Sequence, residues 1–270
     1  GSPNIAPEPS IMKVLQESIM VPENYKYAIN ELPEMKSAIH DWYKNRYNVE
    51  LTYDEMICLQ GSQEALSTLF LAMCDPGDIV LVPDPYYPIF SDGPKIAGAK
   101  VEYMPLLQEN NYVIQLDQID EEIAKKAKMM IVSYPNNPTC AIAPDSFYEE
   151  LIQFAKKYDI VVLHDNAYSE LVFDGKVGKS FLSFEGAKEI GIELNSFSKT
   201  YGMAGARLGV CVGNKEVIDC YNTLKSNMDY GIFLPIQYAG IEALRHGGAS
   251  IHSTCQAYQD RRDALCEAFD

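Results

Sequence analysis

Positive charge is scarce in this sequence. Its 270 residues include 22 lysines and arginines against 38 aspartates and glutamates, which gives a formal net charge of −16. Such a surface repels the phosphates of nucleic acids and the head groups of anionic membranes. No apolar run approaches the roughly 20 residues that a membrane-spanning helix requires. We therefore expect neither a nucleic-acid nor a membrane partner.

The cysteines lack the spacings of a zinc site or of a small disulfide scaffold. No C-x-x-C pair occurs, and no cysteine stands at metal-ligand spacing from a histidine. The seven are Cys58, Cys74, Cys140, Cys211, Cys220, Cys255 and Cys266. Thiols without such spacings are typical of the reduced interior of a cytoplasmic protein. We expect a cytoplasmic protein with no metal site.

Short apolar runs alternate with longer amphipathic ones along the chain. The pattern predicts strands over 56–59, 78–82, 129–133, 160–163, 190–194 and 208–212. It predicts a helix over 62–73 and another that begins at Pro144, with Phe147, Leu151 and Phe154 on one buried face. After Asn214 the sequence is helical, with a break at 247–248. Alternating strands and helices predict an α/β fold, a mostly parallel sheet wrapped by helices.

A lysine with unusual neighbours follows the strand predicted over 190–194. Lys199 stands in Ser196-Phe197-Ser198-Lys199, and Arg207 lies eight residues further on. A buried lysine can lose its proton and form an imine with an aldehyde. The two serines and the arginine are groups that hold a phosphate dianion. An aldehyde and a phosphate together indicate pyridoxal phosphate.

Other loops supply groups for the rest of that cofactor. Asp165 ends a predicted strand, where it would keep the pyridine nitrogen protonated. Tyr168 and Asn137 would contact the phenolic oxygen, and Tyr87 would stack on the ring. The Gly61-Ser62-Gln63 turn opens a helix, so the backbone amides of Ser62 and Gln63 would form an anion site.

These motifs resemble the class I/II aminotransferases of the aspartate aminotransferase superfamily, the fold-type-I pyridoxal phosphate enzymes. The S-x-S-K…G-x-R-x-G signature is matched by Ser196–Lys199 and Gly205–Gly209, and the G-x-P-D opening resembles Gly1–Asn4. The N-P-T-G motif begins at Asn137 but has Cys140 in place of glycine. In the G-x-P-E-L-R segment, Glu31 stands where glycine is usual and Lys36 where arginine is usual.

The resemblance implies roles for single residues. Lys199 would carry the cofactor as a Schiff base and shuttle the substrate proton, and Asp165 would pair with the ring nitrogen. Asn137 and Tyr168 would bind the phenolate oxygen. The phosphate would be held by Ser62, Gln63, Ser196, Ser198 and Arg207.

The resemblance also implies partners and a domain plan. The enzymes act on a small amino acid and a 2-oxo acid, and most are homodimers in which a tyrosine of one subunit reaches the other's phosphate; Tyr25 and Tyr27 both lie in the matching region. We expect an N-terminal segment over 1–30, a large cofactor-binding domain over 31–245, and at 246–270 the start of a helix leading to a C-terminal small domain that is cut short. The arginine for the substrate α-carboxylate belongs to that small domain.

Three functions remain open at this point. The first is an aminotransferase, whose donor could be acidic, aromatic, aliphatic or diaminopimelate. The second is a C–S lyase that uses the same cofactor to eliminate a thiolate from cystathionine-like substrates. The third is a non-catalytic regulatory domain that keeps the fold.

Overall fold

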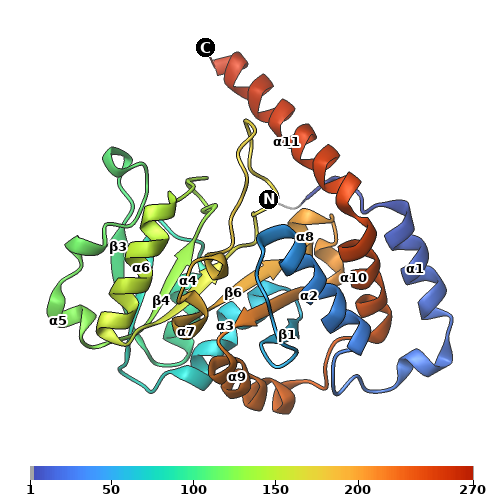
Figure 1. The fold of residues 1–270 in the computed structure, drawn as a ribbon, viewed down its shortest axis with the longest axis horizontal. Helices are drawn as coiled ribbons and strands as arrows, with labels where there is room; N and C mark the ends of the chain where they lie inside the picture. Colours follow the sequence, from blue (N-terminus) through green and yellow to red (C-terminus); the bar gives the residue numbers. More distant parts are fainter. Residues whose placement is uncertain (1–2, 270) are drawn as a thin grey trace.

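A computed structural model describes residues 3–269, so Gly1 and Ser2, the first two residues of the family-like opening, lie outside the described residues. Within that range, seven strands form one sheet in the order β1-β7-β6-β5-β4-β2-β3 (Figure 1). The strands are β1 (Met56–Leu59), β2 (Ile79–Asp84), β3 (Lys100–Pro105), β4 (Ala127–Ser133), β5 (Val161–Asp165), β6 (Gly191–Ser196) and β7 (Gly209–Gly213). The predicted α/β fold is confirmed.

Strand direction determines which loops meet. β7 runs antiparallel to both of its neighbours, β1 and β6, whereas the other strand pairs are parallel. Gly209, the first residue of β7, pairs with Leu59 on one side and with Ser196 on the other. The carboxyl ends of six strands and the amino end of β7 therefore lie at the same end of the sheet, which we call the carboxyl end.

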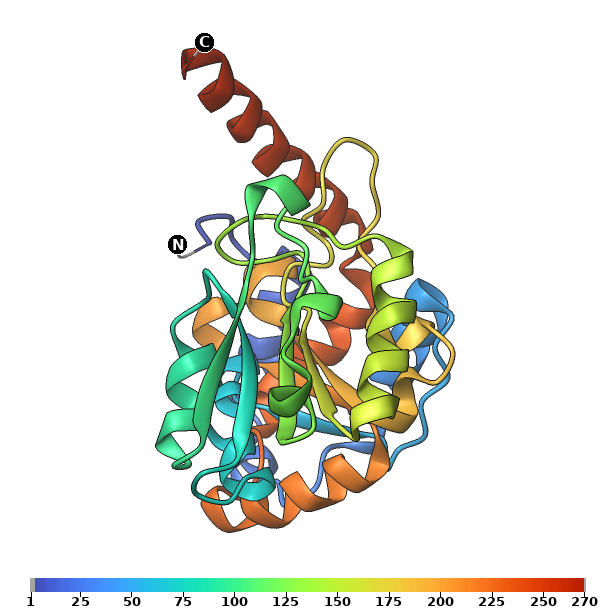
Figure 2. The same cartoon turned by 90° about the vertical axis from the view of Figure 1, so that its left-hand side faces the viewer.

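Helices cover both faces of the sheet (Figures 1 and 2). They are α1 (Pro9–Ile19), α2 (Pro33–Tyr47), α3 (Ser62–Met73), α4 (Ile89–Ile96), α5 (Glu121–Ala124), α6 (Asp145–Tyr158), α7 (Ala187–Ile190), α8 (Phe197–Thr200), α9 (Lys215–Met228), α10 (Leu234–His246) and α11 (Gly248–Phe269). One buried apolar cluster joins one sheet face to α3, α4 and α9, and a second joins the other face to α1, α2, α6 and α10. Alternate residues of β4, such as Met129 and Met130, belong to different clusters because successive strand side chains point to opposite faces.

The structure confirms the predicted elements and shifts some of their ends. The helix predicted over 62–73 is α3, and α6 begins right after Pro144 with Phe147 and Leu151 buried and Phe154 partly buried. β2 continues through Pro83, which pairs with Met104 of β3. Ile190 ends α7, so β6 starts only at Gly191.

Strand β3 was not predicted from the sequence. It forms an edge of the sheet, and most of its side chains are exposed or half-buried, so it lacks the continuous apolar run of the central strands. The predicted break at 247–248 is confirmed, since α10 ends at His246 and α11 starts at Gly248. A second, unpredicted break at 229–233 separates α9 from α10.

α11 extends away from the sheet (Figure 1), and Thr254 is its one buried residue among those described. Across residues 3–269, no helix combines the length and apolar character that crossing a bilayer demands. The seven cysteines, all within the described range, form no disulfide there. The same residues contain no cluster of histidine, cysteine and carboxylate side chains suited to a metal ion.

Candidate active site

Three neighbouring strands bring together the residues predicted to bind phosphate. Ser62 follows β1, Arg207 precedes β7, and Ser196 ends β6; these strands are adjacent in the sheet. A Cβ atom on Gly209 would lie 2.7 Å from the backbone nitrogen of Ser62. The glycine thus allows the first turn of α3 to approach the start of β7.

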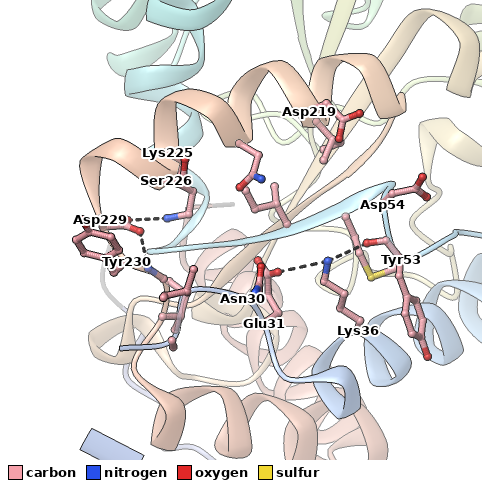
Figure 3. Close-up of a pocket in the computed structure, with 18 residues that line it drawn as sticks. Asn30, Glu31, Lys36, Tyr53, Asp54, Asp219, Lys225, Ser226, Asp229 and Tyr230 are labelled. Carbon is pink, nitrogen blue, oxygen red and sulfur yellow. Dashed lines mark hydrogen bonds and ion pairs between the residues drawn. The ribbon is translucent and has the colours of Figure 1, made fainter. Parts of the chain in front are cut away.

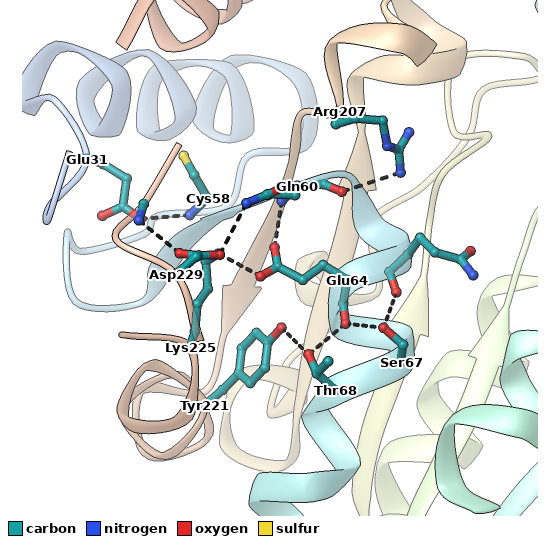
Figure 4. Close-up of polar contacts among 12 residues, drawn as sticks. Glu31, Cys58, Gln60, Glu64, Ser67, Thr68, Arg207, Tyr221, Lys225 and Asp229 are labelled. Carbon is teal, nitrogen blue, oxygen red and sulfur yellow. Dashed lines mark hydrogen bonds and ion pairs between the residues drawn. The ribbon is translucent and has the colours of Figure 1, made fainter. Parts of the chain in front are cut away.

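The turn before α3 packs against Arg207 (Figure 4). Gly61 has φ of 74°, and a Cβ atom there would lie 2.3 Å from Nη2 of Arg207. The guanidinium donates to the carbonyl oxygens of Ala204, at 3.0 Å, and of Gln60, at 3.3 Å. Ser62 and Gln63 open α3, where backbone amides have no partner within the helix and can receive an anion.

The two serines of the signature are buried beside this turn. The hydroxyl of Ser196 accepts a hydrogen bond from the backbone N–H of Ser198 at 3.2 Å and so caps the short helix α8. α8 also carries Lys199, whose position is thereby tied to the end of β6. Local capping explains why a lysine can be held directly after a strand.

Asp165 is the last residue of β5 and is buried. Its Oδ1 atom has no hydrogen-bond partner among the described residues. Burial raises the pKa of this carboxyl to about 6, an effect that neighbouring His164 opposes. A buried carboxylate oxygen without a partner is costly, and a protonated ring nitrogen would satisfy it. This orphan atom fits the pyridinium of the predicted cofactor.

Three further side chains, Tyr168, Asn137 and Tyr87, connect the surroundings of Asp165 to the start of α3. Tyr168 and Asn137 share a side-chain hydrogen bond, and burial followed by the charge of Asp165 raises the pKa of Tyr168 to about 12. The hydroxyl of Tyr87 donates to Oε1 of Gln63 at 3.0 Å. Tyr87 is also close enough to Tyr168 to raise its pKa further.

Lys199 is half-buried, and its Nζ lies 5.9 Å from the centre of the Tyr168 ring. Burial lowers the pKa of its amine, and the positive charge of Arg207 lowers it further. An amine of lowered pKa is more often neutral near pH 7 and hence nucleophilic toward an aldehyde. The arrangement can thus bind a phosphate, hold a pyridinium and react with an aldehyde.

All ten predicted site residues lie at strand ends, on loops or in the first turns of helices at the carboxyl end of the sheet; their roles toward the cofactor stay predictions. The sequence reading missed Ser133 and Asn136, which are buried there. Ser133 Oγ and Asn136 Nδ2 have no hydrogen-bond partner among residues 3–269. Their positions could have identified them. Ser133 ends the strand predicted over 129–133 and pairs with Asp165, and Asn136 follows three residues later.

The departures from the family motifs have local explanations. Glu31 pairs with Lys36 at 3.4 Å, so the two unusual residues contact each other (Figure 3). Glu31 also accepts from the Cys58 N–H at 2.9 Å. Glu31 and Lys36 line a cavity of about 560 Å³ beside α9. Cys140 has φ of 59°, a left-handed conformation that glycine adopts more easily.

Tyr25 and Tyr27 do not point into this chain's own site. Both are exposed; Tyr25 packs edge-on against Phe233, and Tyr27 packs at a tilt against Tyr230. We refer to these two exposed pairs together as the aromatic patch.

Comparisons with known proteins agree with this geometry. The family described as aminotransferase class I and II matches residues 3–270. The LL-diaminopimelate aminotransferase of Halothermothrix orenii is 46% identical over 271 residues, covering 100% of this chain and 70% of the relative. That of Moorella thermoacetica is 42% identical over 272 residues, with the same coverage.

Solved structures agree as well. Substrate-bound BacF from Bacillus subtilis superposes with a TM-score of 0.96 at 37% identity, over 99% of this chain and 69% of that one. A probable N-succinyldiaminopimelate aminotransferase from Thermus thermophilus gives 0.94 at 31% identity, over 99% and 73%. These findings support amino-group transfer over the lyase and the non-catalytic regulator. The chain belongs to the class I and II aminotransferase family and is a pyridoxal-phosphate-dependent aminotransferase acting on small amino and 2-oxo acids.

Proposed function

We propose that the protein transfers an amino group from LL-diaminopimelate to a 2-oxo acid. Two relatives that carry this activity in their names are 46% and 42% identical to the whole chain. The observation that carries the catalytic assignment is Asp165, whose buried Oδ1 has no hydrogen-bond partner within the described part of the chain, at the end of the sheet where Lys199 also lies. Pyridoxal phosphate, when bound, supplies an electron sink for the carbanion formed at the substrate Cα.

The residues at the carboxyl end would divide the work as follows. The Ser62 and Gln63 amides, the Ser196 and Ser198 hydroxyls and the Arg207 guanidinium hold the phosphate.

Asp165 keeps the ring nitrogen protonated, Asn137 and Tyr168 bind the phenolic oxygen, and Tyr87 covers a ring face. Lys199 would provide the amine that anchors the cofactor and would then move the proton between the substrate Cα and the C4′ atom of the cofactor. Burial, followed by the charge of Arg207, lowers the pKa of this amine, which favours the neutral form that a base requires.

We further propose that the protein acts as a cytoplasmic homodimer and that residues 31–245 form its cofactor-binding domain. The aromatic patch supports the dimer, because Tyr27 is 77% and Tyr230 is 61% exposed in the single chain. Adjacent aromatic side chains this exposed are typical of a protein interface. Light scattering of the purified protein measures this directly; a monomer at micromolar concentration would contradict the dimer.

The substrate proposal is tested by steady-state kinetics with a panel of donors and 2-oxo acid acceptors. We expect kcat/KM for LL-diaminopimelate to exceed that for aspartate, an aromatic and an aliphatic amino acid by at least tenfold. A higher value for another donor would refute the substrate. Pyruvate formed from cystathionine without an added acceptor would favour the lyase.

A further inference from the structure

Lys225 is a buried lysine on α9, outside the group of residues that form the cofactor site. Its side chain is 5% exposed, and its Nζ lies 2.7 Å from Oε1 of Glu64 and 2.7 Å from Oδ2 of Asp229. One ammonium thus faces two carboxylates that are themselves mostly shielded from solvent, Glu64 at 13% and Asp229 at 20% exposed. Buried charges in such a cluster depend strongly on each other, because removal of one leaves the others uncompensated.

This cluster holds the turn that precedes α3 (Figure 4). The second oxygen of Glu64, Oε2, accepts from the backbone N–H of Gln60 at 2.6 Å. The carbonyl oxygen of Gln60 accepts from Nη2 of Arg207 at 3.3 Å. Gln60 is therefore fixed at both of its backbone groups, by Glu64 on one side and by Arg207 on the other, directly before Gly61.

The cluster also fixes the segment between α9 and α10. Asp229 accepts from the Gly231 N–H at 2.8 Å through Oδ1, and Nε2 of Gln60 lies 3.4 Å from Oδ2. Tyr230 of the aromatic patch lies between Asp229 and Gly231 in the chain. Lys225 therefore connects the turn before α3 to the segment that carries part of the patch.

The positive charge of Lys225 balances the negative charges of Glu64 and Asp229. Glu64 is the third residue of α3, in the same helical turn as the Ser62 and Gln63 amides. Burial raises the pKa of Glu64, which its hydrogen bond from Lys225 opposes. Without the lysine, Glu64 and Asp229 would place two uncompensated negative charges near amides that are to receive a dianion, and like charges in a low dielectric repel strongly.

We propose that Lys225 is a positioning residue for cofactor phosphate binding: it orients Glu64, and through it the Gln60–Ser62 turn, and it cancels the charge that would repel the phosphate. The inference rests on the proposed function, since it requires Ser62 and Gln63 to bind the phosphate. It assigns to Lys225 no contact with substrate or cofactor.

The test compares the affinities of the cofactor-free protein for pyridoxal phosphate and for pyridoxal, which lacks the phosphate, by titrating the visible absorbance band. In Lys225→Met we expect the affinity for pyridoxal phosphate to fall at least tenfold, while the affinity for pyridoxal changes less than threefold. Lys225→Arg should stay within threefold of the unchanged protein for both. Glu64→Gln combined with Lys225→Met should regain most of the lost affinity, because the repelling charge is gone and the amide oxygen can still accept from Gln60.

Lys215→Met is the matched control. Lys215 lies on the same helix and also pairs with two carboxylates, Asp54 at 3.0 Å and Asp219 at 2.9 Å, but it is exposed. We expect no change in either affinity.

Equal losses for both ligands in Lys225→Met, no loss, or failure of the double variant to recover would overturn the inference and indicate a purely structural lysine. If the unchanged protein binds pyridoxal phosphate no better than pyridoxal, the proposed phosphate site itself is wrong, and the inference falls with it.

Discussion

The imidazole Nδ1 of His164 lies 3.0 Å from Oε2 of Glu193, and both side chains are completely buried. The other ring nitrogen, Nε2, lies 3.2 Å from the carbonyl oxygen of Tyr134. Glu193 also accepts from Tyr43, Ser180 and the Phe181 N–H. The pair joins β4, β5 and β6 one residue away from Asp165.

Loss of the buried pair should destabilise the fold. Glu193→Gln removes one partner of this buried pair and alters the carboxylate that also accepts from Tyr43, Ser180 and the Phe181 N–H, and we expect the free energy of unfolding to fall by about 3 to 5 kcal/mol. The comparison variant is Glu242→Gln, which breaks a pair with His246 of similar distance, 2.9 Å, at the surface. It should cost less than about 1 kcal/mol. Urea unfolding of both variants measures the difference; equal losses would contradict the role of burial.

Asp165→Asn should stabilise the cofactor-free protein and abolish transamination. Because the folded-state pKa of Asp165 is raised to about 6, the protonated form favours folding. This contribution is present below pH 4 and is lost as the pH rises from 4 to 6. At pH 8 the asparagine variant should gain about 3 kcal/mol of unfolding free energy, since burial raises the pKa of Asp165 from 3.8 to about 6 and one pKa unit corresponds to roughly 1.4 kcal/mol.

The measurement is urea unfolding of both cofactor-free proteins at pH 4 and pH 8, with transamination assayed in parallel. The gain should be smaller at pH 4. A variant less stable at pH 8, or one with normal turnover, would contradict the assignment of Asp165 to the ring nitrogen.

Lys199→Ala should abolish the visible absorbance of the lysine-bound cofactor, because no other amine is expected at that position. Lys176→Ala, at an exposed lysine in the loop after β5, should keep the band. Since burial and the charge of Arg207 lower the pKa of Lys199, the band should form faster with rising pH, and its rate should level off at a lower pH than for a free lysine amine reacting with pyridoxal phosphate. Persistence of the band in Lys199→Ala would show that another lysine carries the cofactor.

Gly61→Ala should weaken cofactor binding as well as stability. At φ of 74° an alanine costs about 1 to 2 kcal/mol, and its Cβ would lie 2.3 Å from Nη2 of Arg207. Gly77→Ala separates the two effects: φ is 96°, but a Cβ there would meet no atom within 4 Å. Thermal unfolding should show a loss for both variants, and titration should show at least a tenfold loss of pyridoxal phosphate affinity only for Gly61→Ala. Similar affinities would mean that Arg207 does not act in phosphate binding.

Central strands were predictable because they are buried on both faces. β4 and β5 contain continuous apolar or β-branched runs, and residues at or after their ends were site candidates. The edge strand β3 was missed for the opposite reason. Its mostly exposed or half-buried side chains give a weaker pattern, and only its pairing with β2 identifies it.

The site was predictable as an ordered set of motifs, but not as a set of contacts. That Ser62, Arg207 and Ser196 would meet depends on the antiparallel insertion of β7, which no local pattern encodes. The pair of Lys225 with Glu64 likewise joins α9 to α3 through tertiary packing. Long-range ion pairs of this kind leave no periodic signal in a sequence.

The position of β7 has a consequence for how the protein matures. β1 and β6 touch β7 but not each other, so residues 59 and 196 come together only when the last strand of the sheet has inserted between them. Closing such long loops is entropically costly and slow. The cofactor, by binding across these strands, would stabilise only chains in which this insertion is complete. At a concentration 100 times its dissociation constant, a ligand specific for the folded state adds about 2.7 kcal/mol of stability, so cofactor supply in the cell would set how long newly made chains survive.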